Sequence, residues 1–224
     1  GGVEIERIRE ATEYGSAIDT YLDALDDRVG AVLSSNYEYP GRYTRWDTAI
    51  VDPPLGIEAN GRAVKIIAYN DRGKVLLPAI EKVLVKHDHI ASLENFDDRS
   101  ELTVKQAGVI ESEELRSRAP TVFSVVRAIV DLFRSDADPS LGLFGAFGYD
   151  LAFQFEAIEK RLERPDDNRD VVLFLPDEIL VVDHHQAIAW HDRYEFSVDG
   201  NTTDGLSRDT PDALFVPSDI TPPK

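Results

Sequence analysis

The chain has 224 residues, a formal net charge of −18 and no cysteine. A surface this acidic repels phosphate backbones and anionic lipids, which argues against nucleic-acid and membrane partners. The lack of cysteine excludes disulfides, zinc–thiolate sites and thiol nucleophiles. The sequence has no run of 18 apolar residues and no signal-peptide pattern at its start, so we expect a cytoplasmic protein.

The first predicted element is a helix over residues 14–25, because apolar residues recur there at spacings of three and four. Thr12 is its expected N-cap, and Gly30 lies just past its end. A short apolar run at residues 31–33 then predicts a buried strand. That strand stops at the polar triplet Ser34-Ser35-Asn36.

A second strand, a hairpin and a second helix follow. The strand covers residues 42–51 and ends at Pro53-Pro54. Asn60-Gly61 predicts a type I′ turn, in which both positions need positive φ. The helix covers residues 75–84, where Pro78 is tolerated only near the first turn. The expected arms of the hairpin are residues 55–59 and 62–69.

The rest of the chain continues this mixture of helices and strands, and residues 87–100 are polar and turn-like. Its predicted elements are a strand at 101–107, a short helix at 111–116, a helix at 121–134, a glycine-spaced strand running into a short helix at 142–156, and a hairpin with arms 171–182 and 186–198. Helices and strands do not alternate regularly. We therefore predict an α+β fold with mostly antiparallel, sandwich-like sheets and helices packed on the outside.

The glycines at 142, 145 and 148 match neither a dinucleotide fingerprint nor a phosphate-binding loop. We interpret them as strand glycines that allow another backbone to approach closely. Tyr149 and Asp150 then serve as a strand-end anchor and a helix N-cap.

The histidines suggest no metal site. His87 and His89 form a pair whose further ligands would have to come from distant residues, so a solvated loop is the better interpretation. His184 and His185 fall at a predicted hairpin tip, where water satisfies them. No pair of acids is set apart for acid–base work, so the pattern predicts no catalytic residue and no metal ligand.

Residues 32–46 (VLSSNYEYPGRYTRW) are different. Small hydroxyls and an amide at the end of an apolar strand can hydrogen-bond an ammonium or carboxylate group. The neighbouring aromatic groups are suited to flank a ring. The alternative from the residues alone is a well-capped strand end with a packed tryptophan.

Val32-Leu33-Ser34-Ser35 and Gly41-Arg42-Tyr43-Thr44 resemble the strand end and following turn at the start of chorismate-utilising synthases of the anthranilate synthase type. The segment GLFGAFGYDLAFQFE resembles that family's glycine-rich strand. The stretches RYTRWDTAIVDPPL and LFLPDEILVVDHH are similar to the fused bacterial form, in which synthase and glutamine amidotransferase share one polypeptide.

The resemblance implies the amino-terminal part of a magnesium-dependent lyase that converts chorismate and glutamine-derived ammonia into anthranilate and pyruvate, in tryptophan biosynthesis. The chorismate and magnesium ligands would lie outside this chain, so no cofactor is expected within it. This part would supply one wall of the site for the feedback inhibitor tryptophan, formed by Leu33, Ser34, Ser35, Asn36 and Tyr43. Ser34 departs from the family, because many relatives carry glutamate there to pair with the ammonium group. Glu38 or another part of the polypeptide would supply that charge.

The same resemblance predicts a regulatory domain over residues 1–213 and a linker over 214–224 that leads to a chorismate-binding domain. The expected partners are that domain and the amidotransferase domain, and an exposed apolar face predicts self-association into homo-oligomers. Two alternatives stay open. One is the same portion of an aminodeoxychorismate synthase or a phenazine-pathway relative, and the other is a free-standing amino-acid-binding or interaction module.

Overall fold

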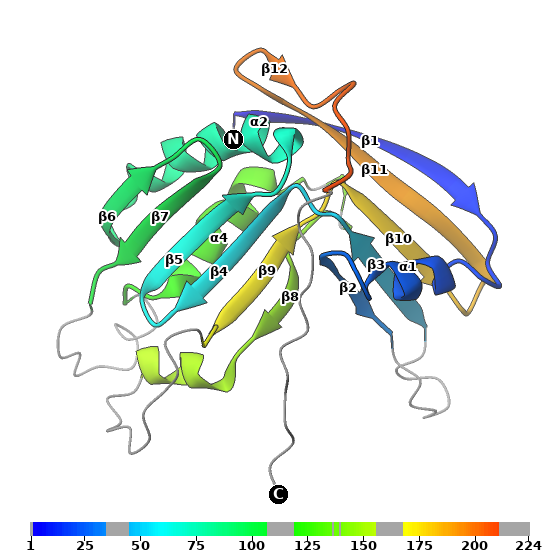
Figure 1. Ribbon diagram of the computed structural model, residues 1–224, viewed down its shortest axis with the longest axis horizontal. Coiled ribbons are helices and arrows are strands. Elements are labelled where there is room, and N and C mark those ends of the chain that lie inside the picture. Colours follow the sequence, from blue (N-terminus) through cyan, green and yellow to red (C-terminus); the bar gives the residue numbers. More distant parts are fainter. Residues whose placement is uncertain are drawn as a thin grey trace, which may run out of the picture.

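Two antiparallel β-sheets lie side by side in the computed structural model (Figure 1). The structure describes residues 2–34, 45–106, 119–135, 137–138, 140–155 and 168–210. Within these ranges, no helix is long and apolar enough to cross a bilayer. The predicted α+β class with mostly antiparallel strands is confirmed.

The first sheet has the strand order β1-β11-β10-β3-β2, and β12 adds to β11. Its strands are β1 (Val3–Thr12), β2 (Gly30–Leu33), β3 (Trp46–Val51), β10 (Glu178–Asp183), β11 (Ile188–Val198) and β12 (Asn201–Thr202). The second sheet has the order β6-β7-β5-β4-β9-β8. Its strands are β4 (Leu55–Asn60), β5 (Ala63–Ala68), β6 (Ile90–Asn95), β7 (Arg99–Val104), β8 (Phe144–Phe147) and β9 (Val171–Leu175).

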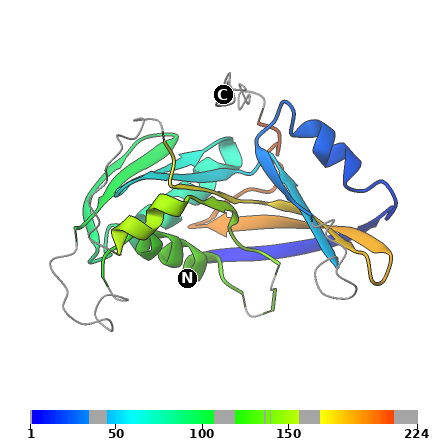
Figure 2. The same ribbon diagram turned by 90° about the horizontal axis from the view of Figure 1, so that it is seen from below.

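Helices cover one face of each sheet. Helices α2 (Asp71–Leu84) and α4 (Val122–Phe133) lie along the second sheet, and α1 (Asp19–Ala24) lies over the first (Figures 1 and 2). A short 3₁₀ helix, η1 (Tyr149–Gln154), follows β8. The main core joins α2 and α4 to both sheets, and the Phe133 ring of α4 meets Phe196 of β11 edge-on at 5.8 Å.

Two connections carry the chain from one sheet to the other. Asp52, Pro53 and Pro54 join β3 to β4, while Pro176 and Asp177 join β9 to β10. The predicted first arm of the last hairpin is therefore wrong as a single strand, since Pro176 divides it between the sheets. The hairpin itself is confirmed for β10 and β11.

The structure corrects the start of the chain. β1 pairs with β11 over its whole length, from Val3 opposite Val198 to Thr12 opposite Ala189. Thr12 is thus the last residue of a strand and not a helix N-cap. Helix α1 is also shorter than predicted, because it begins only after Ile18.

Residues 87–100, expected to be turn-like, contain β6 and the start of β7. β6 is an edge strand with a register shift between Ile90 and Ser92, so its burial pattern lacks the alternation that marks a strand. The predicted strand after residue 100 is confirmed as β7. The helix predicted at 111–116 lies outside the described residues.

The two longer helices are confirmed, although α2 begins at Asp71, earlier than predicted, and α4 begins at Val122. The side chain of Asn70 caps α2 by accepting a hydrogen bond from the Gly73 amide at 3.1 Å. Thr121, the first residue of the predicted range, is the N-cap of α4. Pro78 lies in the interior of α2 and not in its first turn. The hairpin between β4 and β5 turns on Gly61-Arg62, where only Gly61 has positive φ, so the expected type I′ turn is wrong.

The glycine-spaced segment behaves as predicted at Gly145 and, less tightly, at Gly148, where a Cβ would lie 3.3 Å from the Asp170 backbone. A Cβ on Gly145 would lie 2.1 Å from the Val172 carbonyl oxygen, so this glycine allows β8 to approach β9. Gly142 has no atom within 4 Å of such a Cβ. The N-cap of η1 is Gly148 and not Asp150, and Tyr149 is exposed and anchors nothing.

Candidate functional site

The candidate motif lies at the end of β2, an edge strand that pairs with β3 within the described chain. Its backbone follows β3 from Gly30 opposite Val51 to Leu33 opposite Thr48. The strand was expected to be buried, but the Leu33 side chain is 49% exposed and Ser34 is exposed as well. An edge strand has one open side, which explains the difference.

Of the five predicted site residues, Leu33 and Ser34 are thus exposed at the rim of the first sheet. Ser35, Asn36 and Tyr43 lie outside the described residues. Leu33 and Ser34 are neighbours in the chain, and Ser34 is not buried in the interior.

Leu33 shares one face of the first sheet with two tryptophans. A single cross-strand row runs from Leu33 through Thr48 and Val181 to Trp190. Trp46 is two residues from Thr48 and so projects from the same face. We call Leu33, Trp46, Ile188 and Trp190 the distal face. Leu33, Trp46 and Ile188 are each more than 40% exposed.

Two arginines hold these tryptophans. The Arg45 guanidinium lies 4.4 Å from the centre of the Trp46 ring and pairs with Asp183 at 3.0 Å. The two indoles meet edge to face at 6.1 Å. A fixed indole beside a cation can receive another aromatic ring or a carboxylate.

Arg9 fixes the second tryptophan from β1. Its guanidinium makes two bonds of 2.7 Å to the buried Asp192 carboxylate and lies 4.6 Å from the Trp190 ring centre. The indole nitrogen of Trp190 donates to Asp192 at 3.0 Å. Sequence reasoning missed Arg9 and Trp190, because their place beside the motif depends on pairing between residues far apart in the chain.

Helix α1 and the residues before it cover the opposite face, where histidines have protein partners. His184 contacts the Tyr14 hydroxyl at 2.9 Å and the Asp47 carboxylate at 2.7 Å. The expectation that water satisfies His184 is therefore wrong.

The other histidine pair, His87 and His89, also has a protein partner. His89 lies 2.8 Å from the Ser124 hydroxyl of α4, so the expected solvated loop is not confirmed.

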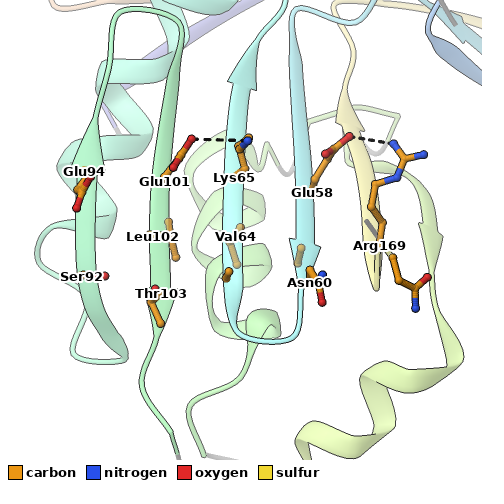
Figure 3. Close-up of a pocket in the computed structure, with 13 residues that line it drawn as sticks. Glu58, Asn60, Val64, Lys65, Ser92, Glu94, Glu101, Leu102, Thr103 and Arg169 are labelled. Atoms are coloured by element: carbon orange, nitrogen blue, oxygen red, sulfur yellow. Dashed lines mark hydrogen bonds and ion pairs between the residues drawn. The ribbon is translucent and has the colours of Figure 1, made fainter. Parts of the chain in front are cut away.

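A hollow lies elsewhere, on the open face of the second sheet (Figure 3). It has a volume of about 560 Å³, and charged side chains cross it in rows. Lys65 pairs with Glu101 at 3.6 Å, and Arg169 pairs with Glu58 at 3.1 Å. The charges within each pair neutralise each other, and of the predicted site residues that the structure describes, neither Leu33 nor Ser34 lines this hollow. Among the described residues, no group of three or more acidic or histidine side chains is placed to hold a metal ion.

Comparison with known proteins finds relatives that are anthranilate synthases. The chain is 46% identical over 206 residues to an anthranilate synthase of Azospirillum brasilense, covering 92% of this chain and 28% of that protein. The chain is related to the amino-terminal part of anthranilate synthase. Anthranilate synthase component 1 of Serratia marcescens is 27% identical over 80% of this chain and 34% of its own length. The corresponding component of Salmonella typhimurium is 26% identical over 71% of this chain and 30% of its own length.

The chain thus spans about a third or less of these anthranilate synthases. No protein-family model matches it. The motif at the end of β2 is the feature of the chain from which a role within such a protein can be proposed.

Proposed function

We propose that the chain is the regulatory amino-terminal portion of an anthranilate synthase large component and contributes no catalytic residue. The complete enzyme would convert chorismate and glutamine into anthranilate and pyruvate with magnesium. The chorismate-binding and amidotransferase domains of the same polypeptide would be its partners. The similarity to anthranilate synthases supports this proposal, and the chemistry would take place in the other domains.

Within that enzyme, Leu33, Ser34, Ser35, Asn36 and Tyr43 would form one wall of the site for tryptophan, the feedback inhibitor. The observation that carries this assignment is the exposure of Leu33 and Ser34 at an open sheet edge. A site completed by a second wall requires such exposure, because residues sealed in the core cannot meet a ligand.

The neighbours of the motif suit this ligand. Trp46 offers an exposed aromatic surface on the same face as Leu33, and the Arg45 guanidinium lies over its ring. An indole ring can pack against such a surface, while a cation favours the carboxylate of an amino acid. Ser34 cannot pair with the ammonium group as a glutamate would, so that charge has to come from Glu38 or from another domain.

The substitution Ser35→Phe in the full-length enzyme tests the site. The phenyl ring would occupy ligand space, so we expect the tryptophan concentration for half-inhibition to rise at least tenfold while kcat for anthranilate formation stays unchanged. Fluorescence of the product anthranilate measures both quantities.

Ser92→Phe is the matched control, because Ser92 is an exposed serine on β6, an edge strand of the other sheet. It should leave inhibition as it is. Unaltered tryptophan inhibition in Ser35→Phe would remove this motif from the inhibitor site. Absence of anthranilate from the full-length protein would reject the enzyme assignment itself.

A further inference from the structure

The segment after β12, residues 203–210, crosses the region where the two sheets are joined, and we call it the strap. It contacts the start of α2, both connections between the sheets and the loop before β2. Thr203 and Thr210 at its ends are both almost fully buried. Its two halves are held in very different ways.

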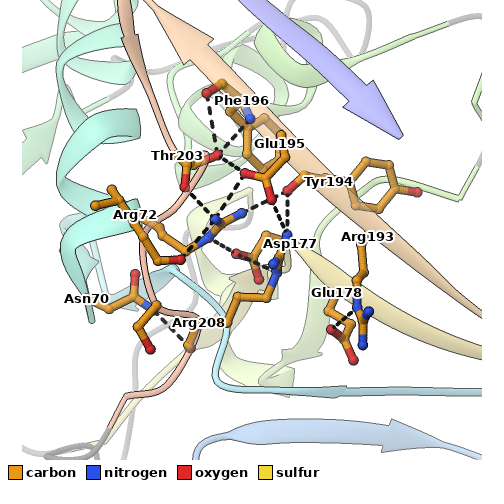
Figure 4. Close-up of polar contacts among 12 residues, drawn as sticks. Asn70, Arg72, Asp177, Glu178, Arg193, Tyr194, Glu195, Phe196, Thr203 and Arg208 are labelled. Atoms are coloured by element: carbon orange, nitrogen blue, oxygen red, sulfur yellow. Dashed lines mark hydrogen bonds and ion pairs between the residues drawn. The ribbon is translucent and has the colours of Figure 1, made fainter. Parts of the chain in front are cut away.

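The first half of the strap is fixed by Arg72, a fully buried arginine of α2 (Figure 4). Its guanidinium pairs with Asp177, pairs with Glu195 at 3.0 Å, and donates to the Thr203 carbonyl oxygen at 2.7 Å. Thr203 also donates its hydroxyl to Glu195 at 2.7 Å. A buried and fully hydrogen-bonded charge network of this kind is costly to open.

The second half is held more weakly at its outer end, around Asp209, than at Arg208, which lies 3.6 Å from the buried Asp177 carboxylate and donates to the Tyr194 carbonyl oxygen at 3.2 Å. Asn70 of α2 donates to the Arg208 carbonyl oxygen and to the Thr210 hydroxyl at 3.3 and 3.2 Å. Arg208 pairs with Glu195 at 2.6 Å, and Asp209 pairs with Arg28 at 3.2 Å. Since the Asp209 side chain is three-quarters exposed, its pair with Arg28 is a surface ion pair of the kind that contributes little.

A cavity of about 210 Å³ lies beneath this second half, lined by residues that include Tyr21 of α1, Asp52, Asp177 and Asp209. Among the described residues, Arg208 Nε and Asp52 Oδ1 are buried near it without a hydrogen-bond partner, although Arg208 Nε lies 3.6 Å from the Asp177 carboxylate. Burial raises the pKa of Asp52, against the opposing effect of Arg28. Buried polar groups are rarely left without a hydrogen-bond partner. The closed strap is therefore imperfectly packed at its outer end.

Arg28 connects this outer end to β2. The same Arg28 nitrogen that meets Asp209 also pairs with Asp52, which is 6% exposed and has a left-handed φ of 52°. The Asp52 amide donates to the Val29 carbonyl oxygen at 2.8 Å. Arg28 and Val29 immediately precede β2, whose other end carries Leu33 and Ser34.

The start of β2 is also tightly packed. A Cβ on Gly30 would lie 2.2 Å from the Ile50 carbonyl oxygen, so β2 has little room to move sideways against β3. A displacement at the motif is therefore passed along the four residues of the strand, over about 10–13 Å, to Arg28. There it changes how the Arg28 guanidinium is shared between the Asp52 and Asp209 carboxylates.

We propose that residues 207–210 are a releasable latch on Arg28, through which ligand binding at the end of β2 is coupled to the polypeptide that follows Thr210. This inference rests on the proposed inhibitor site. Asp52 holds Arg28 in both arrangements, while the contact with Asp209 forms or breaks. Coupling through such an element is reciprocal, so whatever acts on the chain after Thr210 also alters binding at the motif.

The test compares Asp209→Asn with Asp204→Asn and Asp209→Glu in the full-length polypeptide. Asp204 is an exposed carboxylate in the same strap and serves as the matched control, while glutamate keeps the charge that Arg28 needs. For Asp209→Asn we expect at least fivefold weaker tryptophan inhibition, with the calorimetric Kd for tryptophan changed less than twofold. The control and the conservative variant should retain full inhibition.

Hydrogen exchange gives a readout that does not depend on activity. Tryptophan should change the exchange of the Asp209 and Thr210 amides in the unaltered protein and leave the Thr203 amide, held beside Arg72, unaffected. The latch proposal is wrong if tryptophan inhibits Asp209→Asn as strongly as the unaltered protein. It is also wrong if tryptophan does not change the exchange rates of the Asp209 and Thr210 amides. If the unaltered protein neither binds tryptophan nor is inhibited by it, the proposed function fails and the latch with it.

Discussion

At the scale of single residues, partly buried carboxylates with several partners set how the fold responds to acid. Glu178 at the start of β10 accepts hydrogen bonds from the Tyr21 hydroxyl at 3.1 Å and from Arg193 Nε at 2.7 Å, and His191 lies 3.4 Å away. Burial raises the pKa of Glu178, but the bonds from His191 and Arg193 outweigh it and lower the pKa to about 2.

The first prediction follows from this pKa. A carboxylate whose folded pKa lies below its usual value of 4.5 stabilises the fold above that value, and the contribution is lost as the pH falls toward 2. Glu178→Gln should therefore lower the free energy of unfolding near pH 6 by up to about 3 kcal/mol. Its stability curve should converge with that of the unaltered chain as the pH approaches 2.

Urea unfolding at pH 6, 4 and 2.5 measures this difference. Glu94→Gln, at an exposed position on β6, is the control and should follow the unaltered chain throughout. Curves for Glu178→Gln and the unaltered chain that stay parallel across this range would show that Glu178 titrates alike in the folded and unfolded states.

At the scale of elements, close backbone approach decides where glycine is required. Gly145 in β8 has a φ of +148°, and a Cβ there would lie 2.1 Å from the Val172 carbonyl oxygen. Gly145→Ala should therefore destabilise the chain by at least about 2 kcal/mol through backbone strain and overpacking. Gly142→Ala, with no atom within 4 Å, should stay within about 0.5 kcal/mol. Thermal unfolding of both variants separates them, and equal melting temperatures would remove the special role of Gly145.

Sequence reasoning identified the elements whose signal is local. Helix α4 has a strong apolar period and a Thr121 N-cap, so it could be predicted to within a residue or two. β1 was missed because half of its ten residues are charged and their strand character depends on β11, whose nearest paired residue lies 177 positions away. Propensity for β-structure depends on such neighbours, and the sequence does not show them.

The candidate site was predictable to the same extent. The end of β2 could be found because an apolar run stops at three small polar residues. The aromatic and cationic groups beside it come from β1, β3 and β11, and only the cross-strand register shows that Trp190 and Leu33 share a face. The buried arginine Arg72 has no sequence signature at all, because its partners come from the connection between β9 and β10, from β11 and from the strap.

At the scale of the whole molecule, strong acidity and an exposed apolar face act against each other. The net charge of −18 keeps copies of the chain apart. The distal face favours association, because Leu33, Trp46 and Ile188 are exposed together on one sheet. Salt screens the repulsion within about 10 Å at 0.1 M and leaves the apolar attraction in place.

We therefore predict that the isolated 224-residue chain self-associates, and more strongly as salt increases. In sedimentation velocity between 5 and 200 µM, we expect the sedimentation coefficient to rise with concentration, more steeply at 0.5 M than at 0.05 M NaCl. The double substitution of Trp46→Ser and Ile188→Ser should largely abolish the rise, because it removes two of the three exposed side chains.

Val85→Ser is the control that tests whether self-association depends on the distal face or on the exposure of any single apolar side chain. The Val85 side chain is 68% exposed at the end of α2, more than any member of the distal face, but it lies outside that patch. Single exposed apolar residues are common on protein surfaces, so this variant should associate like the unaltered chain. Equal suppression by Val85→Ser, or association that weakens with salt, would assign the attraction to something other than the distal face.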